Sequence, residues 1–175
     1  MRKALLSILT ALAALAVTSS IALAAVNVKS FPTASFSGDT VTLTGGNFSG
    51  LGSVPAIAEF QATAGIATYT CTNPQGHASP GQNPVPAQPG PVGTQDLGNA
   101  DHNGRGTISN LSAAVSAPPT PSAQTVGCGG KGSTQWTVTL NTLTATAAHL
   151  EIKQNGAVVF CRNYTIDGPA IGTAC

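Results

Sequence analysis

An alternation of apolar and polar residues with a period of two recurs along the chain and limits it to β-structure. In "QWTVTL", Trp136, Val138 and Leu140 share one face, and in "HLEIK" Leu150 and Ile152 do the same. Valine, isoleucine, threonine and aromatic residues dominate these segments, and all of them favour strands. Beyond the first 24 residues, no segment has the 3.6-residue period of an amphipathic helix. We therefore expect an all-β protein.

Asn155-Gly156 in "HLEIKQNGAVVFCRNYTI" is the firmest local signal. Asn-Gly between two alternating runs predicts a hairpin with a type I′ turn, because both central residues of that turn need a positive φ. A regular ladder from this turn places Lys153 opposite Val158 and Glu151 opposite Phe160. The core face then carries Leu150, Ile152, Val159 and Cys161. The opposite, mixed face carries His149, Glu151, Lys153, Val158, Phe160, Arg162 and Tyr164.

Short strand-like runs separated by proline-rich connections predict an antiparallel, immunoglobulin-like β-sandwich of seven or eight strands. Residues 74–91 hold six of the 12 prolines and residues 117–122 hold three more. Prolines at this frequency exclude a central strand and favour long extended loops. A further strand near Val85 or Val92 stays open. The expected strands lie near 26–37, 40–48, 56–64, 66–73, 106–116, 135–146, 148–154 and 157–166.

Residues 1–24 have the pattern of a cleaved secretory signal peptide. A basic start, Met1-Arg2-Lys3, precedes an apolar run from Ala4 to Val17, and "IALAA" supplies the small residues of a signal-peptidase site. A retained membrane anchor is the alternative, but the run is shorter than the roughly 20 apolar residues of a bilayer span. We expect residues 25–175 to form one domain of a secreted, extracellular protein without a membrane span.

Charge is scarce and is not clustered. Charged residues make up 7% of the chain, against roughly 25% in an average globular protein. Five basic and six acidic residues follow residue 24, which leaves a net charge of −1. Nucleic acid is not an expected partner, because phosphate binding depends on clustered lysine and arginine.

Four cysteines, Cys71, Cys128, Cys161 and Cys175, predict two disulfides in an exported chain. Four cysteines allow three pairings, and the sequence alone does not choose among them. We favour Cys71–Cys128 together with Cys161–Cys175, because the second pair closes a short loop and ties down the C-terminus. Zinc is the competing interpretation, which the wide spacings without a CxxC pair disfavour.

The segment "CTNPQGHASPGQNP", residues 71–84, resembles a signature of small exported proteins from actinobacteria and related soil bacteria. These proteins share Cys-x-Asn…Pro-Gly-Gln-Asn-Pro, then a second cysteine, a W-T-V/A-T strand and a closing hairpin. Cys128 and "QWTVTLNTLTATAAHLEIKQNGAVVF" match the later pieces, so the resemblance spans residues 36–160. It implies a signal peptide, an all-β fold and a Cys71–Cys128 pair, but no activity. Cys161 and Cys175 depart from it and suggest an added C-terminal staple.

A calcium site is one chemical alternative. "DHNGRGTISNLS" matches an EF-hand loop at Asp101 and Asn103. Arg105 occupies the fifth position, where an oxygen ligand belongs, and Ser112 replaces the bidentate glutamate of the twelfth. We therefore expect a glycine-rich turn. A calcium site of another kind stays open, and its ligands would be Asp96, Asn99, Asp101 and Asn103.

No catalytic constellation stands out. His77, His102 and His149 lie in different contexts, and none has an identifiable nucleophile and orienting group. "GCGGKGST" lacks the Gly-Lys-Ser/Thr of a phosphate-binding loop, because Gly132 interrupts it. A copper or zinc site joining His77 and His102 is an alternative. We predict a protein that is not an enzyme and needs no cofactor or metal.

The expected function is that of an exported, non-catalytic β-sandwich protein at the cell surface or in the extracellular matrix. The alternative is a carbohydrate-binding module whose rings, Phe160 and Tyr164, stack on cell-surface or environmental polysaccharide beside Glu151 and Arg162. The competing expectation is that another strand or the proline-rich loop covers these rings, or that they are ordinary single apolar residues on the surface. Self-association through a vacant sheet edge is a further mode of partnership.

Overall fold

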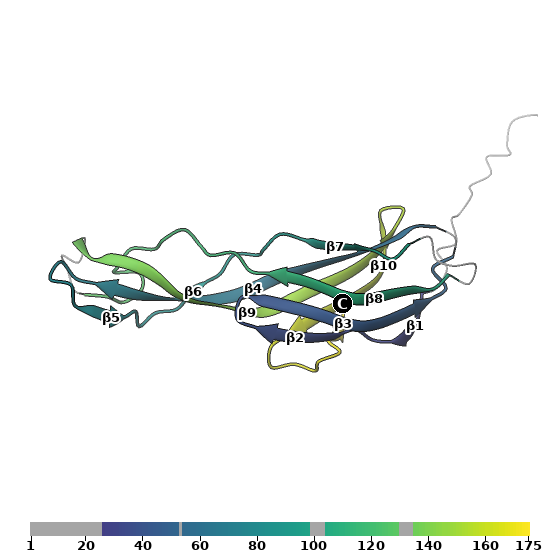
Figure 1. Ribbon diagram of the computed structural model, residues 1–175, viewed down its shortest axis with the longest axis horizontal. Coiled ribbons are helices and arrows are strands. Elements are labelled where there is room, and N and C mark those ends of the chain that lie inside the picture. Colours follow the sequence, from purple (N-terminus) through teal and green to yellow (C-terminus); the bar gives the residue numbers. More distant parts are fainter. Residues whose placement is uncertain (1–25, 53, 99–103, 130–134) are drawn as a thin grey trace, which may run out of the picture.

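The computed structural model describes residues 26–52, 54–98, 104–129 and 135–175, and it is nearly all β (Figure 1). Its eleven strands form two antiparallel sheets, which confirms the all-β antiparallel fold predicted from the alternation, with more strands than the seven or eight expected. The predicted signal peptide, residues 1–24, lies outside the described residues. Within the described part of the chain, no helix has the length and hydrophobicity needed to cross a membrane.

The first sheet is built around β3 (Thr40–Ser49). Strand β8 (Gly106–Ala114) pairs with one edge of β3 along nearly its whole length. On the other edge, β1 (Asn27–Ser30) and β2 (Thr33–Ser37) follow one another. Pro32 lies between these two short strands, where the missing N–H of proline costs no ladder hydrogen bond.

The second sheet is built on two long strands, β4 (Ala56–Thr72) and β9 (Thr137–Gln154), which pair antiparallel over their length. The sheet continues from β9 to two strands on one side. Three short strands follow one another along the free edge of β4. These five are β10 (Ala157–Thr165), β11 (Thr173–Ala174), β5 (Ala78–Pro80), β6 (Val85–Pro86) and β7 (Gly93–Asp96).

Each long strand joins two strands that the sequence predicted separately. Register shifts near Ala62–Gly65 and the facing Ala145–Ala148 mark β-bulges, which bend a strand without ending it. Three short strands also occur in or directly after the proline-rich connection, β5 at Ala78–Pro80, β6 at Val85 and β7 directly after Val92. The prolines thus leave room for short edge strands, the place where a sheet tolerates them.

The molecule is elongated and has two parts (Figure 1). At one end, the first sheet packs on the near half of the second and forms a sandwich. At the other end, the far halves of β4 and β9 continue beyond the first sheet. We call this second part the arm; it comprises residues 64–86, 117–129 and 135–146.

The sandwich core is filled by the inward-facing side chains of both sheets. Burying a side chain of this kind contributes about 1.5–3 kcal/mol. The core also includes Tyr164, which is 1% exposed. The other large members are Val41, Leu43, Phe48, Ile108, Leu111, Phe60, Leu150 and Ile152.

The arm has a small core of its own. Tyr69 and Cys71 on β4 pack against Val126 and Cys128, so that the loop before β9 covers one face of the arm. The Cys71–Cys128 disulfide is present, as predicted, and both cysteines are buried. Trp136 packs half-buried against this cluster.

The segment Pro-Gly-Gln-Asn-Pro, residues 80–84, holds the loop before β9 against the arm through hydrogen bonds. The N–H of Gly81 donates to Tyr69 O at 2.7 Å, and the N–H of Asn83 donates to Val126 O at 3.1 Å. The Asn83 side chain also donates from Nδ2 to Thr125 O at 3.2 Å. A Cβ at position 81 would lie 3.0 Å from Tyr69 O, which explains the glycine. The signature is therefore structural.

The C-terminal hairpin has the predicted turn but not the predicted register. Asn155 and Gly156 both have positive φ, 50° and 78°, and Val158 pairs with Lys153 as expected. A β-bulge then follows at Val159, so the predicted pairing is wrong beyond it.

The bulge inserts one residue, and each later side chain changes face because the side-chain period of a strand is two. Phe160 lies opposite Ile152 instead of Glu151. Cys161 lies opposite Glu151 instead of Leu150. Phe160 therefore turns toward the core, and Cys161 turns outward.

Replacing Cys71 and Cys128 by alanine is expected to loosen the arm before the sandwich. The disulfide joins positions 57 residues apart, so its loss lowers the free energy of unfolding by about 4 kcal/mol. In urea, the fluorescence of Trp136 should change at lower concentration than the far-ultraviolet circular dichroism of the sheets. If the fluorescence and the circular dichroism changed together at the urea midpoint of wild type, the idea that the arm loosens before the sandwich would be contradicted.

Candidate functional site

Of the aromatic pair predicted on the hairpin surface, Tyr164 lies in the interior and Phe160 lies half-buried against the core. Tyr164 is 1% exposed, and its hydroxyl donates to Pro32 O at 3.3 Å. Its ring meets Phe60 edge-on, and Phe160 meets Phe48 edge-on with ring centroids 5.1 Å apart. Neither ring belongs to a free platform for stacking on a sugar.

Arg162 lies on the same side of β10 as these rings. Its guanidinium carbon is 3.8 Å from the ring centroid of Phe31, and Nη1 donates to Gly172 O at 3.2 Å. Glu151 lies on the other face of the sheet, opposite Cys161. The four residues predicted to form one binding surface are thus divided between two faces by the bulge in β10.

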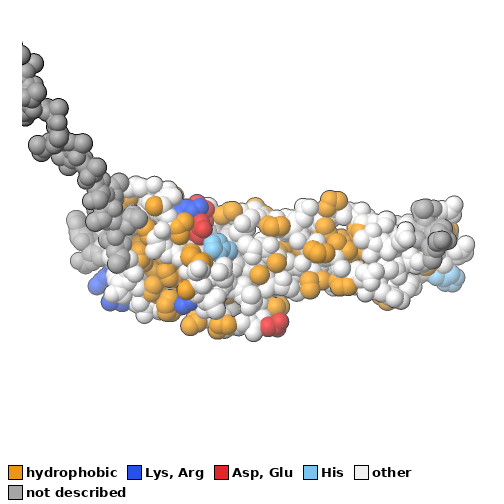
Figure 2. All heavy atoms as spheres, turned by 180° about the vertical axis from the view of Figure 1, so that it is seen from behind, with side chains coloured by type: hydrophobic (Ala, Val, Ile, Leu, Met, Phe, Trp, Pro, Cys, Tyr) orange, Lys and Arg blue, Asp and Glu red, His pale blue; other side chains and the backbone are white. Residues whose placement is uncertain are grey.

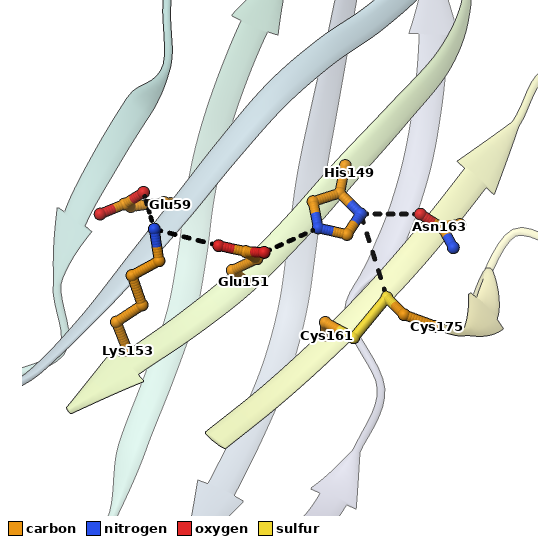
Figure 3. A network of polar contacts seen from close by, with 7 residues as sticks. All are labelled: Glu59, His149, Glu151, Lys153, Cys161, Asn163 and Cys175. Carbon is orange, nitrogen blue, oxygen red and sulfur yellow. Dashed lines mark hydrogen bonds and ion pairs between the residues drawn. A yellow bond between two sulfur atoms is a disulfide. The ribbon is translucent and has the colours of Figure 1, made fainter. Parts of the chain in front are cut away.

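The outer face of the second sheet carries a polar cluster instead (Figure 3). Glu59 on β4 and Glu151 on β9 lie directly opposite each other, a pairing that is unfavourable for like charges. Lys153 offsets it, because its Nζ lies 2.7 Å from Glu59 Oε2 and 3.0 Å from Glu151 Oε2.

His149 extends this cluster toward the C-terminus. Its Nε2 lies 3.2 Å from Glu151 Oε1, and its Nδ1 lies 2.7 Å from Asn163 Oδ1. The same Nδ1 lies 3.9 Å from Sγ of Cys175, which is bonded to Cys161 as predicted. An unbroken chain of contacts therefore links Glu59 to the C-terminal disulfide (Figure 3).

Strand alternation and the bulge together assemble the cluster. Positions 149, 151 and 153 share a face of β9, as the sequence predicted. The bulge brings Cys161 and Asn163 of β10 to that same face. Sequence reasoning missed their meeting with His149, because "AVVFCRN" contains no glycine or proline that signals the extra residue.

Hydrogen bonds within the cluster shift the pKa values of Glu151 and Lys153. The ammonium of Lys153, and after it His149, lowers the pKa of the Glu151 carboxyl against the opposing effect of burial. The carboxylates of Glu59 and Glu151 raise the pKa of Lys153. These side chains stay about 30% exposed, so water screens the attraction and the cluster adds little stability.

The metal alternatives receive no support from the described residues. In residues 26–52, 54–98, 104–129 and 135–175, no three histidine, cysteine, aspartate or glutamate side chains gather to hold an ion. Asp96 accepts a hydrogen bond from Gly98 N at 2.8 Å, and His77 N donates to Asn73 Oδ1 at 2.8 Å. The other residues considered for calcium or copper, Asn99, Asp101, His102 and Asn103, lie outside the described part.

The arm presents a second surface, which is uncharged. None of its residues, as defined above, is lysine, arginine, aspartate or glutamate. Figure 2 shows charged side chains on the sandwich end, while the arm carries hydrophobic and uncharged polar side chains and a histidine at its tip. Hydroxyls line one face, where Thr68 and Thr142 bond across the strands at 2.6 Å. The other threonines of this face are Thr70, Thr72, Thr137 and Thr139.

Residues 137–144 of β9, "TVTLNTLT", form an open edge. Their inner side pairs with β4, and no strand in the described part of the chain pairs with their outer side. Strand β10 pairs with β9 only from Ala147 onward, and Ala145 N donates to Gly38 O at 2.8 Å. Leu140 on this edge is 41% exposed.

No family model, curated protein or solved structure matches this chain in the three comparisons made.

Replacing Tyr164 by phenylalanine tests the burial of its hydroxyl. Burial raises the pKa of Tyr164 to about 12 from 10.0, so the neutral phenol stabilises the fold below pH 10. That contribution is lost as the pH rises through about 12. At pH 7 the free energy of unfolding of Tyr164→Phe should be about 1 kcal/mol lower than that of wild type, because the hydrogen bond is lost. As the pH rises from 10 to about 12, this free energy should fall less in Tyr164→Phe than in wild type. If urea denaturation showed the same decrease in the free energy of unfolding for both proteins at alkaline pH, this placement of the hydroxyl would be contradicted.

Replacing Lys153 by methionine tests the polar cluster. Without the ammonium, the pKa of Glu151 should rise toward its ordinary value of 4.5, as measured by carbon-13 NMR titration. In wild type, the ionised carboxylate stabilises the fold above pH 4.5, and this contribution disappears as the pH falls through the lowered pKa. Lys153→Met should weaken that acid dependence. Lys29→Met, which removes an exposed lysine from β1, is the control and should leave the pKa of Glu151 unchanged.

Proposed function

We propose that this protein is a non-catalytic structural protein of the cell surface or extracellular matrix that associates with further copies of itself. The association uses the open edge of β9, residues 137–144. One observation supports the proposal above the others: this edge lies on an uncharged arm that a disulfide braces.

An unpaired strand edge is a template for another strand. It presents a row of N–H and C=O groups, and an added strand satisfies them through main-chain hydrogen bonds. Soluble proteins guard such edges with lysine, proline or inward-pointing charge. The edge "TVTLNTLT" has none of these, and its residues have a high propensity for strands.

A second copy is the occupant that the arm favours. Two edges of the same sequence can pair antiparallel about a twofold axis, with the same segment contributed by both chains. Because the described residues of the arm carry no charge, the two copies meet without electrostatic repulsion. The arm extends beyond the first sheet, so the two sandwiches need not collide (Figure 1).

The arm is also prepared for pairing before a partner arrives. The disulfide and the small core around Tyr69 and Val126 hold β4 and β9 together. Rigid presentation lowers the entropy lost on association, and affinity therefore rises without any new contact. The Pro-Gly-Gln-Asn-Pro segment holds the extended loops against the arm, and the loops in turn help to keep β4 and β9 rigid.

Export is supported by the two disulfides, which persist in oxidising compartments. The carbohydrate-binding alternative is less supported, because Tyr164 is buried and Phe160 packs half-buried against the sandwich core. Trp136, a further large ring, lies half-buried against the core of the arm. We therefore retain self-association and do not propose a polysaccharide ligand.

Placing two lysines on the edge tests the proposal. Thr139→Lys with Asn141→Lys adds like charges where two copies would meet, so association should be abolished. Sedimentation velocity over a concentration series measures it, and wild type should shift from monomer to dimer or larger species. The matched control, Gln75→Lys with Gln124→Lys, adds the same charge to exposed arm positions away from the edge and should behave as wild type.

Two results would reject the proposal. One is a wild-type protein that stays monomeric at millimolar concentration. The other is an edge variant that associates as strongly as the control.

A further inference from the structure

The two disulfides lie in opposite surroundings. Cys71 and Cys128 are 0% and 3% exposed and lie among the apolar side chains of the arm. Cys175 is exposed and Cys161 is half-buried, on the outer face of the second sheet. Thiol–disulfide exchange needs an accessible sulfur, so only the C-terminal disulfide is open to it in the folded protein.

The surroundings of Cys175 also contain the groups that exchange uses. The Nδ1 of His149 lies 3.9 Å from Cys175 Sγ, within reach of a proton transfer. Glu151 Oε1 lies 3.2 Å from Nε2, and Nδ1 lies 2.7 Å from Asn163 Oδ1 as well as 3.9 Å from the sulfur, so the protonated ring donates to both oxygens and places an N–H beside Cys175. Lys153 in turn fixes Glu151 at 3.0 Å. A sulfur, a base and an orienting carboxylate therefore stand in line, as in an activated nucleophile.

We propose that Cys161–Cys175 is a thiol–disulfide exchange site for low-molecular-weight thiols, in which Cys175 forms the mixed disulfide and His149 transfers its proton. This inference is independent of the self-association proposed above, because the site lies on the sandwich and not on the arm.

Reduction proceeds in two steps. The thiolate of a small thiol attacks Cys175 Sγ, an S–S bond forms to the small molecule, and Cys161 leaves as a thiolate that takes a proton from water. A second thiolate attacks the small molecule's sulfur, and Cys175 leaves as a thiolate that takes a proton from Nδ1 of the protonated His149 ring, which regains a proton from water. Two small thiols become one small disulfide, and both cysteines are reduced. In reverse, His149 removes the proton from Cys175, which attacks the small disulfide.

Exchange would leave the C-terminal segment, residues 166–175, held by non-covalent contacts alone. This segment connects the two sheets, because Ala170 O accepts from Ala34 N at 2.8 Å while β11 pairs with β10. Gly172 O accepts from Arg162 Nη1 at 3.2 Å. These hydrogen bonds do not depend on the disulfide, so Cys175 stays tethered near His149 when the S–S bond is open.

Glutathione is the probe for the test. The folded protein is incubated with reduced glutathione, trapped with N-ethylmaleimide and mapped by mass spectrometry. Cys161 and Cys175 should be labelled while Cys71 and Cys128 are not, with the glutathione adduct on Cys175. Reduction that requires denaturant, equal rates for both disulfides, or an adduct confined to Cys161 would overturn the proposal.

Replacing His149 by glutamine tests its role. His149→Gln should slow the reduction by about tenfold or more, since a positioned acid or base contributes at least that much. His77→Gln, the same replacement at the arm tip, is the control and should change nothing. Equal rates in the two variants would reject the role of His149.

A second measurement leaves the polar cluster intact and does not depend on the folding of His149→Gln. Cys161→Ser leaves Cys175 as a single accessible thiol. Iodoacetamide should alkylate it faster in the folded protein than in the same chain in urea, because His149 activates it only in the fold. An equal or slower rate in the folded protein would overturn the proposal.

Discussion

The antiparallel pairing of β4 with β9 is the interaction on which the rest of the structure depends. It begins in the sandwich at Ala56–Gln154 and ends in the arm at Thr72–Thr137. Its near half closes the sandwich core, and its far half carries the arm core around Tyr69. The bulges near Ala62–Gly65 let the two long strands change direction between these cores while their pairing continues. Both disulfides attach peripheral chain to this pair of strands or to their neighbour β10.

Much of this fold is predictable from local sequence. Alternation with a period of two indicates a strand, and Asn155-Gly156 indicates a tight hairpin. The bulge in β10 has no such signal, since "AVVF" is equally compatible with a regular ladder. One inserted residue then decides which face each later side chain takes. For that reason the sequence predicted a surface with Phe160 and Tyr164, where the structure has His149, Glu151 and Cys175 together.

The distribution of charged residues between the sandwich and the arm could likewise not be predicted from the sequence. The sequence reveals few charges, but it does not reveal that every charged residue in the described part of the chain lies outside the arm. Long-range pairing brings the uncharged segments 64–86, 117–129 and 135–146 together. The sandwich thereby receives the charged cluster beside an exposed disulfide, and the arm receives the open edge. The two surfaces are separate and suit different chemistry, covalent exchange at one and strand pairing at the other.

Hydrogen–deuterium exchange of residues 137–144 tests the central claim, that the open edge of β9 is where copies meet. In dilute solution the amides that point outward from this edge have no partner strand in the described structure and should exchange fast. At high concentration they should become protected, while peptides from the buried strands of the sandwich keep their dilute rates. Protection that appears elsewhere, or rates at the edge that do not depend on concentration, would contradict the account.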